Sequence, residues 1–182
     1  MSFRFFTLPA LAATCLFLTA GCGDSSSPEK DPNVLTSNDF EEVIGWIPAP
    51  PTLTREQAHS GFYSVKVDGA NEFSMGYSLP LGKATMRKPH KIRISAWAYM
   101  TDDKSSARLG LQLMDPVAGK EVFGDGINLS EAVKTPRKWV EITKDIILPD
   151  ATTSATEMRV FLWRSSAASP AYIDDLRIAL VE

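Results

Sequence analysis

The chain has 182 residues, with 19 Lys and Arg against 22 Asp and Glu, which gives a formal net charge of −3. This mildly acidic balance argues against a nucleic-acid partner, because such partners are bound through clustered positive charge. The length is sufficient for one domain with a hydrophobic core of ordinary stability.

Residues 1–21 are expected to be a targeting segment that is removed from the mature protein. Arg4 provides a positive charge, and the apolar run over residues 5–18 is interrupted by Pro9. This run is shorter than the roughly 20 residues that a membrane-spanning helix needs. Residues 18–22 (LTAGC) resemble a bacterial lipobox, so Cys22 is expected to become the lipidated first residue. The alternative is an ordinary secretory signal with an incidental cysteine.

Residues 22–32 are small, polar and bounded by proline, which is typical of a flexible tether. Gly23 follows the cysteine where an aspartate would favour retention in the inner membrane, so the outer membrane is the expected location. The sequence does not distinguish its periplasmic face from the cell surface. Cys15 is removed with the signal and Cys22 is acylated, so no thiol remains for a disulfide, a metal or catalysis.

Residues 33–182 are expected to form one all-β domain. Short alternating or β-branched runs, separated by turn residues, predict strands over residues 53–58, 63–67, 72–79, 91–100, 107–113, 139–148 and 157–165. Such spacing is typical of an antiparallel sandwich or barrel. Residues 115–136 are expected to be a long loop with one helical turn over residues 130–133.

Residues 169–181 predict the final strand, and alternation places Asp174 on the same face as Leu176 and Ile178. A carboxylate beside a core is costly unless a cation or a set of N–H donors satisfies it. Asp174 is therefore expected to cap a loop, pair with an Arg or Lys, or bind a metal.

Several stretches resemble carbohydrate-binding modules of families 4 and 9. They are residues 33–36 (NVLT) with 39–41 (DFE) and 45–46 (GW), 59–67 (HSGFYSVKV), 92–98 (IRISAWA), 139–143 (WVEIT) and 172–178 (YIDDLRI). The resemblance implies a galactose-binding-like β-jelly roll of two antiparallel sheets, one of which has an open face. It also implies a structural calcium ion held by Glu41 and Asp174, with main-chain oxygens of residues 60–64. Oxygen ligands of this kind suit Ca²⁺.

Three predicted strands, 91–100, 107–113 and 157–165, each have one aliphatic face, which is expected to be the core. Their opposite faces are expected to form the binding surface, with the residues Trp97, Tyr99, Trp163, Phe161, Arg93, Arg108 and Gln112. Aromatic rings can stack on sugar rings, while guanidinium and amide groups hydrogen-bond hydroxyls. Alternatively, Trp97 and Trp163 are covered by the 115–136 loop, whereas Trp46 and Trp139 are expected to be structural.

An enzymatic function is not expected. The two histidines, His59 and His90, have no metal-ligand neighbours at a suitable spacing. Glu141 and Asp145 have the spacing of a glycosidase pair, but their strand face is more simply solvent-exposed. The sequence therefore predicts a lipid-anchored, non-catalytic domain that binds a poly- or oligosaccharide at the envelope. The alternative is a structural module that docks an envelope protein through the same face.

Overall fold

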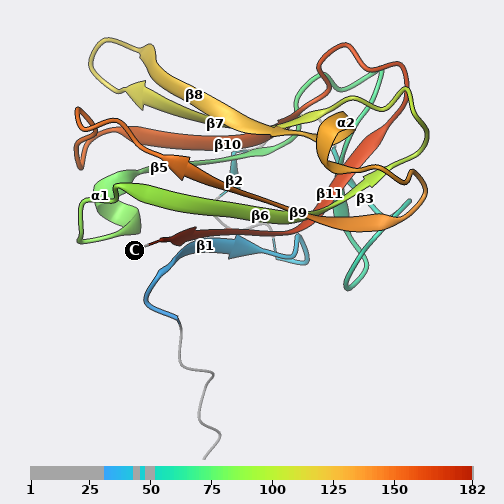
Figure 1. The fold of residues 1–182 in the computed structure, drawn as a ribbon, viewed down its shortest axis with the longest axis horizontal. Coiled ribbons are helices and arrows are strands. Elements are labelled where there is room, and N and C mark those ends of the chain that lie inside the picture. The colour runs from blue at the N-terminus through green and yellow to red at the C-terminus, as the bar shows by residue number, and fades with distance from the viewer. Residues whose placement is uncertain (1–30, 43–45, 48–51, 182) are drawn as a thin grey trace, which may run out of the picture.

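The computed structural model describes residues 31–42, 46–47 and 52–181 (Figure 1). The expected signal segment, most of the tether and Cys22 lie outside these residues. Among the helices in the described part, none is long and apolar enough to cross a membrane.

Eleven strands account for almost all of the regular structure within these described residues. They are β1 (Val34–Asn38), β2 (Trp46–Ile47), β3 (Leu53–Thr54), β4 (Ser64–Val67), β5 (Gly76–Pro80), β6 (Lys91–Met100), β7 (Arg108–Asp115), β8 (Lys120–Asn128), β9 (Trp139–Ile147), β10 (Glu157–Trp163) and β11 (Ala171–Leu180). Two short helices, α1 (Leu81–Ala84) and α2 (Leu129–Ala132), follow β5 and β8.

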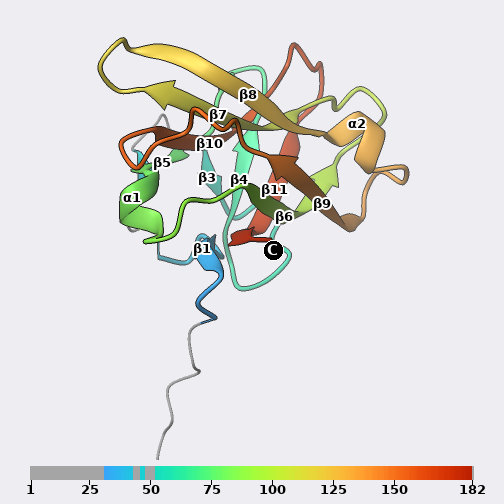
Figure 2. The ribbon, with the colours of Figure 1, turned by 60° about the vertical axis from the view of Figure 1, so that its left-hand side comes forward.

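The strands form two antiparallel sheets that pack face to face (Figures 1 and 2). Sheet A has the order β3-β4-β11-β6-β9, with β1 also paired to β11, and sheet B has the order β2-β5-β10-β7-β8. This arrangement confirms the predicted two-sheet β-sandwich.

The core lies between the sheets, where the aliphatic faces of the predicted strands meet. Its fully buried members include Ile92 and Ile94 of β6, Leu111 of β7 and Val160 of β10. Period-two alternation therefore correctly predicted which side of β6, β7 and β10 faces inward.

The prediction of a loop over residues 115–136 is wrong for most of this segment. Gly119, with φ of 63°, closes a turn after β7, and the chain returns as β8 along the edge of sheet B. The edge position explains why the sequence did not predict this strand, because only two of the nine residues of β8 are buried and the strand shows no aliphatic face. The segment extends sheet B, and the predicted helical turn is one residue earlier, at α2.

Candidate functional site

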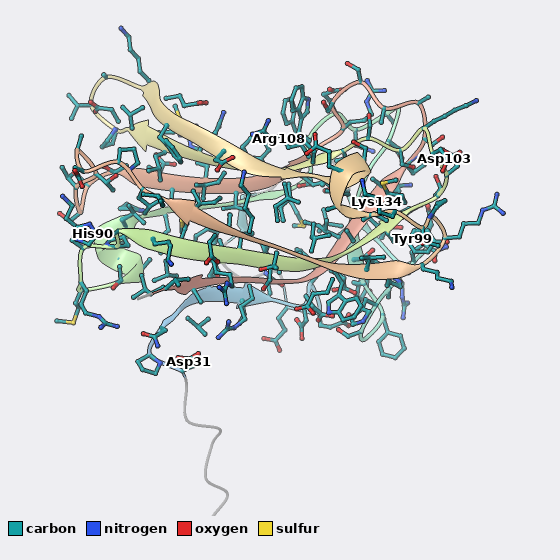
Figure 3. The ribbon with its side chains drawn as sticks, in the orientation of Figure 1. Asp31, His90, Tyr99, Asp103, Arg108 and Lys134 are labelled. Atoms are coloured by element: carbon teal, nitrogen blue, oxygen red, sulfur yellow. The ribbon has the colours of Figure 1, made fainter. Side chains whose placement is uncertain are left out.

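The predicted binding residues lie on two opposite surfaces of the sandwich. Phe161, Trp163, Arg108 and Gln112 are on the outer face of sheet B, whereas Trp97, Tyr99 and Arg93 are on the outer face of sheet A. Figure 3 shows the separation through Arg108 in the layer of β7 and Tyr99 in the layer of β6. The expectation that these residues share one face is wrong, because β6 pairs with β11 and β9, not with β7 or β10.

The outer face of sheet B contains a groove of about 310 Å³. Three strands supply its walls and floor, with the lining residues Arg108, Gly110, Leu111, Gln112, Glu121, Gly124, Asp125, Phe161 and Trp163. We call this feature the groove. It includes all four predicted binding residues of sheet B.

One end of the groove is aromatic. The Phe73 ring lies nearly parallel to the Trp163 ring, with centroids 6.2 Å apart and an interplanar angle of 11°. The Phe73 ring also meets Phe161 edge to face at 5.7 Å, and Phe73 is 51% exposed. Phe73 was not among the predicted binding residues, because it alternates with Met75, Tyr77 and Leu79 in a pattern that is typical of the core-facing side of a strand.

Gly110 forms the floor beneath Phe161. The two residues are directly opposed between β7 and β10, and a Cβ atom on Gly110 would lie 3.2 Å from the Phe161 ring. The missing side chain therefore lets the ring lie close to the sheet.

Gly110→Ala is expected to displace the Phe161 ring, and a ligand held in the groove should then bind about threefold to tenfold more weakly. The steric conflict is a few tenths of an ångström, so the expected loss of stability is about 1 kcal/mol. Affinity electrophoresis and thermal melting measure both quantities. Gly69→Ala is the matched control, because a Cβ at Gly69 meets nothing within 4 Å. Equal affinities for the two variants would contradict this role for Gly110.

The side of the groove formed by β7 and β8 is polar, and its carboxylates accept hydrogen bonds. Gln112 Nε2 donates to Glu121 Oε2 at 2.6 Å, and Lys144 Nζ donates to Asp125 Oδ1 at 2.6 Å. Burial opposes ionisation of Asp125, but the Lys144 ammonium and the Gly126 N–H hold its pKa below the ordinary value. Arg108 Nη2 is 3.9 Å from the same carboxylate oxygen. Its guanidinium is therefore only weakly engaged and can donate to a ligand.

The aromatic residues of sheet A are packed against a loop. The His59 imidazole stacks on Trp97 with ring centroids 3.8 Å apart and an interplanar angle of 11°. Tyr99 contacts the rings of Trp139 and Tyr172 at 5.5 and 5.8 Å. The cover on Trp97 therefore comes from the segment around His59, not from residues 115–136 as the alternative assumed.

Polar side chains on the same surface are also engaged. Arg93 makes two hydrogen bonds to Asp145, at 2.6 and 3.0 Å, and these contacts hold the pKa of Asp145 below its ordinary value. Glu141 is directly opposite Trp97 on β9. Both carboxylates therefore lie on sheet A, away from the groove.

Asp174 lies on a different face from the one predicted. The register of β11 against β6 shifts between Asp174 and Arg177, and Asp175 has φ of 48°. This bulge reverses the alternation, so Asp174 faces the same side as its cross-strand neighbour Trp97, while Ile173 and Leu176 reach the core. Asp174 is nevertheless completely buried, because the loop around His59 covers it.

N–H groups satisfy the two predicted calcium ligands. Asp174 Oδ2 accepts from the backbone of His59 and Ser60 at 2.7 and 3.1 Å, and Oδ1 accepts from Asp175 N at 2.7 Å. Burial raises the pKa of Asp174 more than these donors lower it.

Glu41 Oε1 accepts from the backbone N–H groups of Phe62 and Tyr63 at 2.7 and 2.8 Å. The loop thus presents donors to both carboxylates, which corresponds to the loop-capping alternative. This donor arrangement does not fit a calcium cage, which requires oxygen atoms. No cluster of three or more metal-binding side chains occurs among the described residues.

The comparison with protein families identifies the kind of domain. A family model described as a carbohydrate binding domain matches residues 32–169. No curated protein matches the chain.

Several solved structures share the fold. The CBM22-1 xylan-binding domain of Paenibacillus barcinonensis Xyn10C has a TM-score of 0.57 and 20% identity, over 83% of this chain and 96% of that domain. The C-terminal family 22 module of Clostridium thermocellum Xyn10B has a TM-score of 0.55 and 19% identity, over 82% and 94%.

A third structure joins such a module to a GH10 module. It is the CBM22-1-GH10 part of Clostridium thermocellum xylanase Xyn10B complexed with xylohexaose, with a TM-score of 0.58 and 14% identity. The match covers 84% of this chain but 29% of that one. At these identities the likeness to solved structures establishes the fold alone.

Proposed function

The chain belongs to the family of carbohydrate binding domains whose model matches residues 32–169, and from this premise we propose that it binds xylan or a related polysaccharide in the groove of sheet B. The resemblance drawn from the sequence is thereby confirmed at the level of the family. The single observation that carries the proposed site is the groove itself, in which exposed aromatic rings adjoin paired hydrogen-bonding groups.

The groove matches the two chemical properties of a sugar. The faces of a pyranose ring carry C–H groups, which pack on aromatic surfaces such as Phe73 and Trp163. Its hydroxyls both donate and accept, and the β7 and β8 side of the groove offers the donors of Arg108 together with the acceptors of Glu121 and Asp125. The xylan-binding domains of similar fold make xylan the first ligand to test.

Binding without catalysis is the proposed activity. Among the described groove residues, the carboxylates of Glu121 and Asp125 each accept a hydrogen bond from a neighbouring side chain, Gln112 or Lys144. A glycosidase instead needs two carboxyl groups placed on either side of the scissile bond, one of which is a proton donor.

The first test is retention of the full-length chain, purified in detergent, on a panel of immobilised polysaccharides that includes xylan, cellulose and a β-glucan. We expect retention on xylan that soluble xylan oligosaccharides compete away. Failure to bind any polysaccharide, with melting behaviour intact, would favour the alternative of a module that docks an envelope protein.

We also propose that the chain is anchored to the outer membrane through lipid on Cys22, as the LTAGC motif indicates. More than one acyl chain gives stable anchoring. Metabolic labelling with a fatty-acid analogue is expected to mark the wild-type protein and not the Cys22→Ser variant, which should leave the membrane fraction. Equal labelling of the two proteins would contradict lipidation at Cys22.

A further inference from the structure

Glu72 makes direct contacts with the aromatic end of the groove. Its Oε1 atom accepts a hydrogen bond from the indole Nε1 of Trp163 at 2.8 Å. Its Oε2 atom is held by Arg164, whose Nε and Nη2 atoms lie 2.8 and 2.6 Å away. The guanidinium therefore fixes the carboxylate, and the carboxylate fixes the indole.

The backbone around Glu72 is itself attached to the end of β10. Arg164 N donates to Glu72 O at 2.8 Å, and Ser74 N donates to Leu162 O at 2.9 Å. Phe73 and Trp163 form a β-bridge between these two hydrogen bonds. The position of the Glu72 carboxylate is consequently set by the sheet and does not depend on a free loop.

We propose that Glu72 is a positioning residue, which holds the Trp163 ring at the angle required for stacking on the ligand. The inference rests on the proposed function, in which Trp163 contacts the polysaccharide. A partly exposed Trp ring can otherwise adopt other rotamers, and fixing it before binding avoids an entropic cost. The contact engages the polar edge of the indole, whose ring lies nearly parallel to that of Phe73.

The charge on Glu72 is part of this arrangement. Hydrogen bonds from Arg164 and then from Trp163 hold the pKa of Glu72 below its ordinary value of 4.5. A lowered pKa means that the contribution of this contact to stability is fully present above 4.5. It is lost only as the pH falls through the lowered folded-state pKa.

The test compares Glu72→Ala and Glu72→Gln in the full-length chain, with xylan as the probe. We expect Glu72→Ala to weaken affinity about tenfold, because it removes a charge-assisted hydrogen bond. Glu72→Gln should cost about threefold, because the amide oxygen can still accept from the indole. If Glu72→Ala does not fold, Glu72→Gln decides the question.

Glu56→Ala is the matched control on the opposite sheet. Glu56 likewise accepts from an aromatic donor, Tyr172 Oη at 2.8 Å, and from a cation, Lys66 Nζ at 2.7 Å. Removing Glu56 perturbs a similar network at a distance from the groove, so xylan affinity should stay within twofold of wild type.

A nuclear magnetic resonance measurement reports the contact without any ligand. The indole Hε1 resonance that disappears in Trp163→Phe should shift upfield in both Glu72 variants and stay fixed in Glu56→Ala. In the wild type the resonance should move with pH around a midpoint below 4.5, the ordinary pKa of a glutamate.

The outcomes separate the two proposals. If the wild type binds xylan and the affinity of Glu72→Ala is within twofold of it, the positioning role is overturned but the proposed ligand is not. An indole Hε1 resonance that does not shift in the Glu72 variants would also overturn the positioning role. Absence of xylan binding by the wild type would overturn the proposed ligand, and the positioning role with it.

Discussion

Trp163→Ala is expected to weaken retention on xylan by about thirtyfold or more, while the melting temperature falls by only a few degrees. Loss of a central aromatic contact commonly costs 2 kcal/mol or more of binding free energy, which corresponds to about thirtyfold in affinity. Trp163 lies outside the buried core and is partly exposed. Its removal should therefore affect the ligand more than the fold. Affinity electrophoresis and differential scanning calorimetry measure the two effects.

Trp97→Ala is expected to have the opposite pattern of effects on stability and affinity. Trp97 is stacked under His59 on sheet A, so its removal should lower the free energy of unfolding by about 1–3 kcal/mol and leave xylan affinity within twofold. The original prediction that Trp97 and Tyr99 bind the sugar would instead require loss of retention in Trp97→Ala with little change in melting. The pair of variants therefore decides which sheet carries the site.

Asp174→Asn is expected to lower the free energy of unfolding by about 2–4 kcal/mol. The carboxylate is completely buried and accepts three N–H groups with its two oxygens. An asparagine keeps one acceptor and directs an NH₂ group at a remaining donor, which leaves a buried N–H unsatisfied. Urea unfolding, followed by tryptophan fluorescence, measures the change.

Asp175→Asn is the control for this prediction. Asp175 accepts from Ser60 Oγ and contacts His59 Nδ1, at 2.7 and 2.6 Å, but its side chain is partly exposed. The expected loss is about 1 kcal/mol, since water can replace the lost contacts. Equal losses in the two variants would show that burial of Asp174 does not determine its contribution.

The same unfolding assay tests whether the predicted calcium ion is bound. If the N–H donors alone satisfy Asp174 and Glu41, chelation will leave the wild-type unfolding midpoint unchanged. A midpoint that rises with added Ca²⁺ and falls with chelator would show that the loop turns its carbonyl oxygens toward an ion.

Local sequence patterns predict which side of a strand faces the core, but they do not predict which strands pair. Alternation is local, so it correctly assigned the inward residues of β6, β7 and β10, such as Ile94, Leu111 and Val160. Strand pairing depends on contacts between residues far apart in the chain, so alternation could not place β6 and β7 in different sheets. That is why four of the seven predicted binding residues share the groove and three do not.

Local departures from regular strand patterns explain the other differences between the prediction and the structure. The bulge at Asp175 reverses the two faces of β11 within two residues, and a strict period of two does not predict such a reversal. β8 forms an edge with glycines at positions 124 and 126, which weaken its strand signal. The groove residues Glu121 and Asp125 were missed for the same reason. Glu72 carried no sequence signal, because its role depends on the fold bringing it beside Trp163.

The pairing of β1 determines the side on which the N-terminal chain enters the domain. β1 pairs with β11 on sheet A, and Arg177 holds Asp31 at 2.7 Å where the described chain begins (Figure 1). The groove opens on the opposite sheet. In a protein lipidated at Cys22, the tether would therefore join the domain on the side of sheet A, away from the groove. A polysaccharide in the groove would then lie on the side of the domain away from the tether, so that several anchored copies could bind one polysaccharide chain.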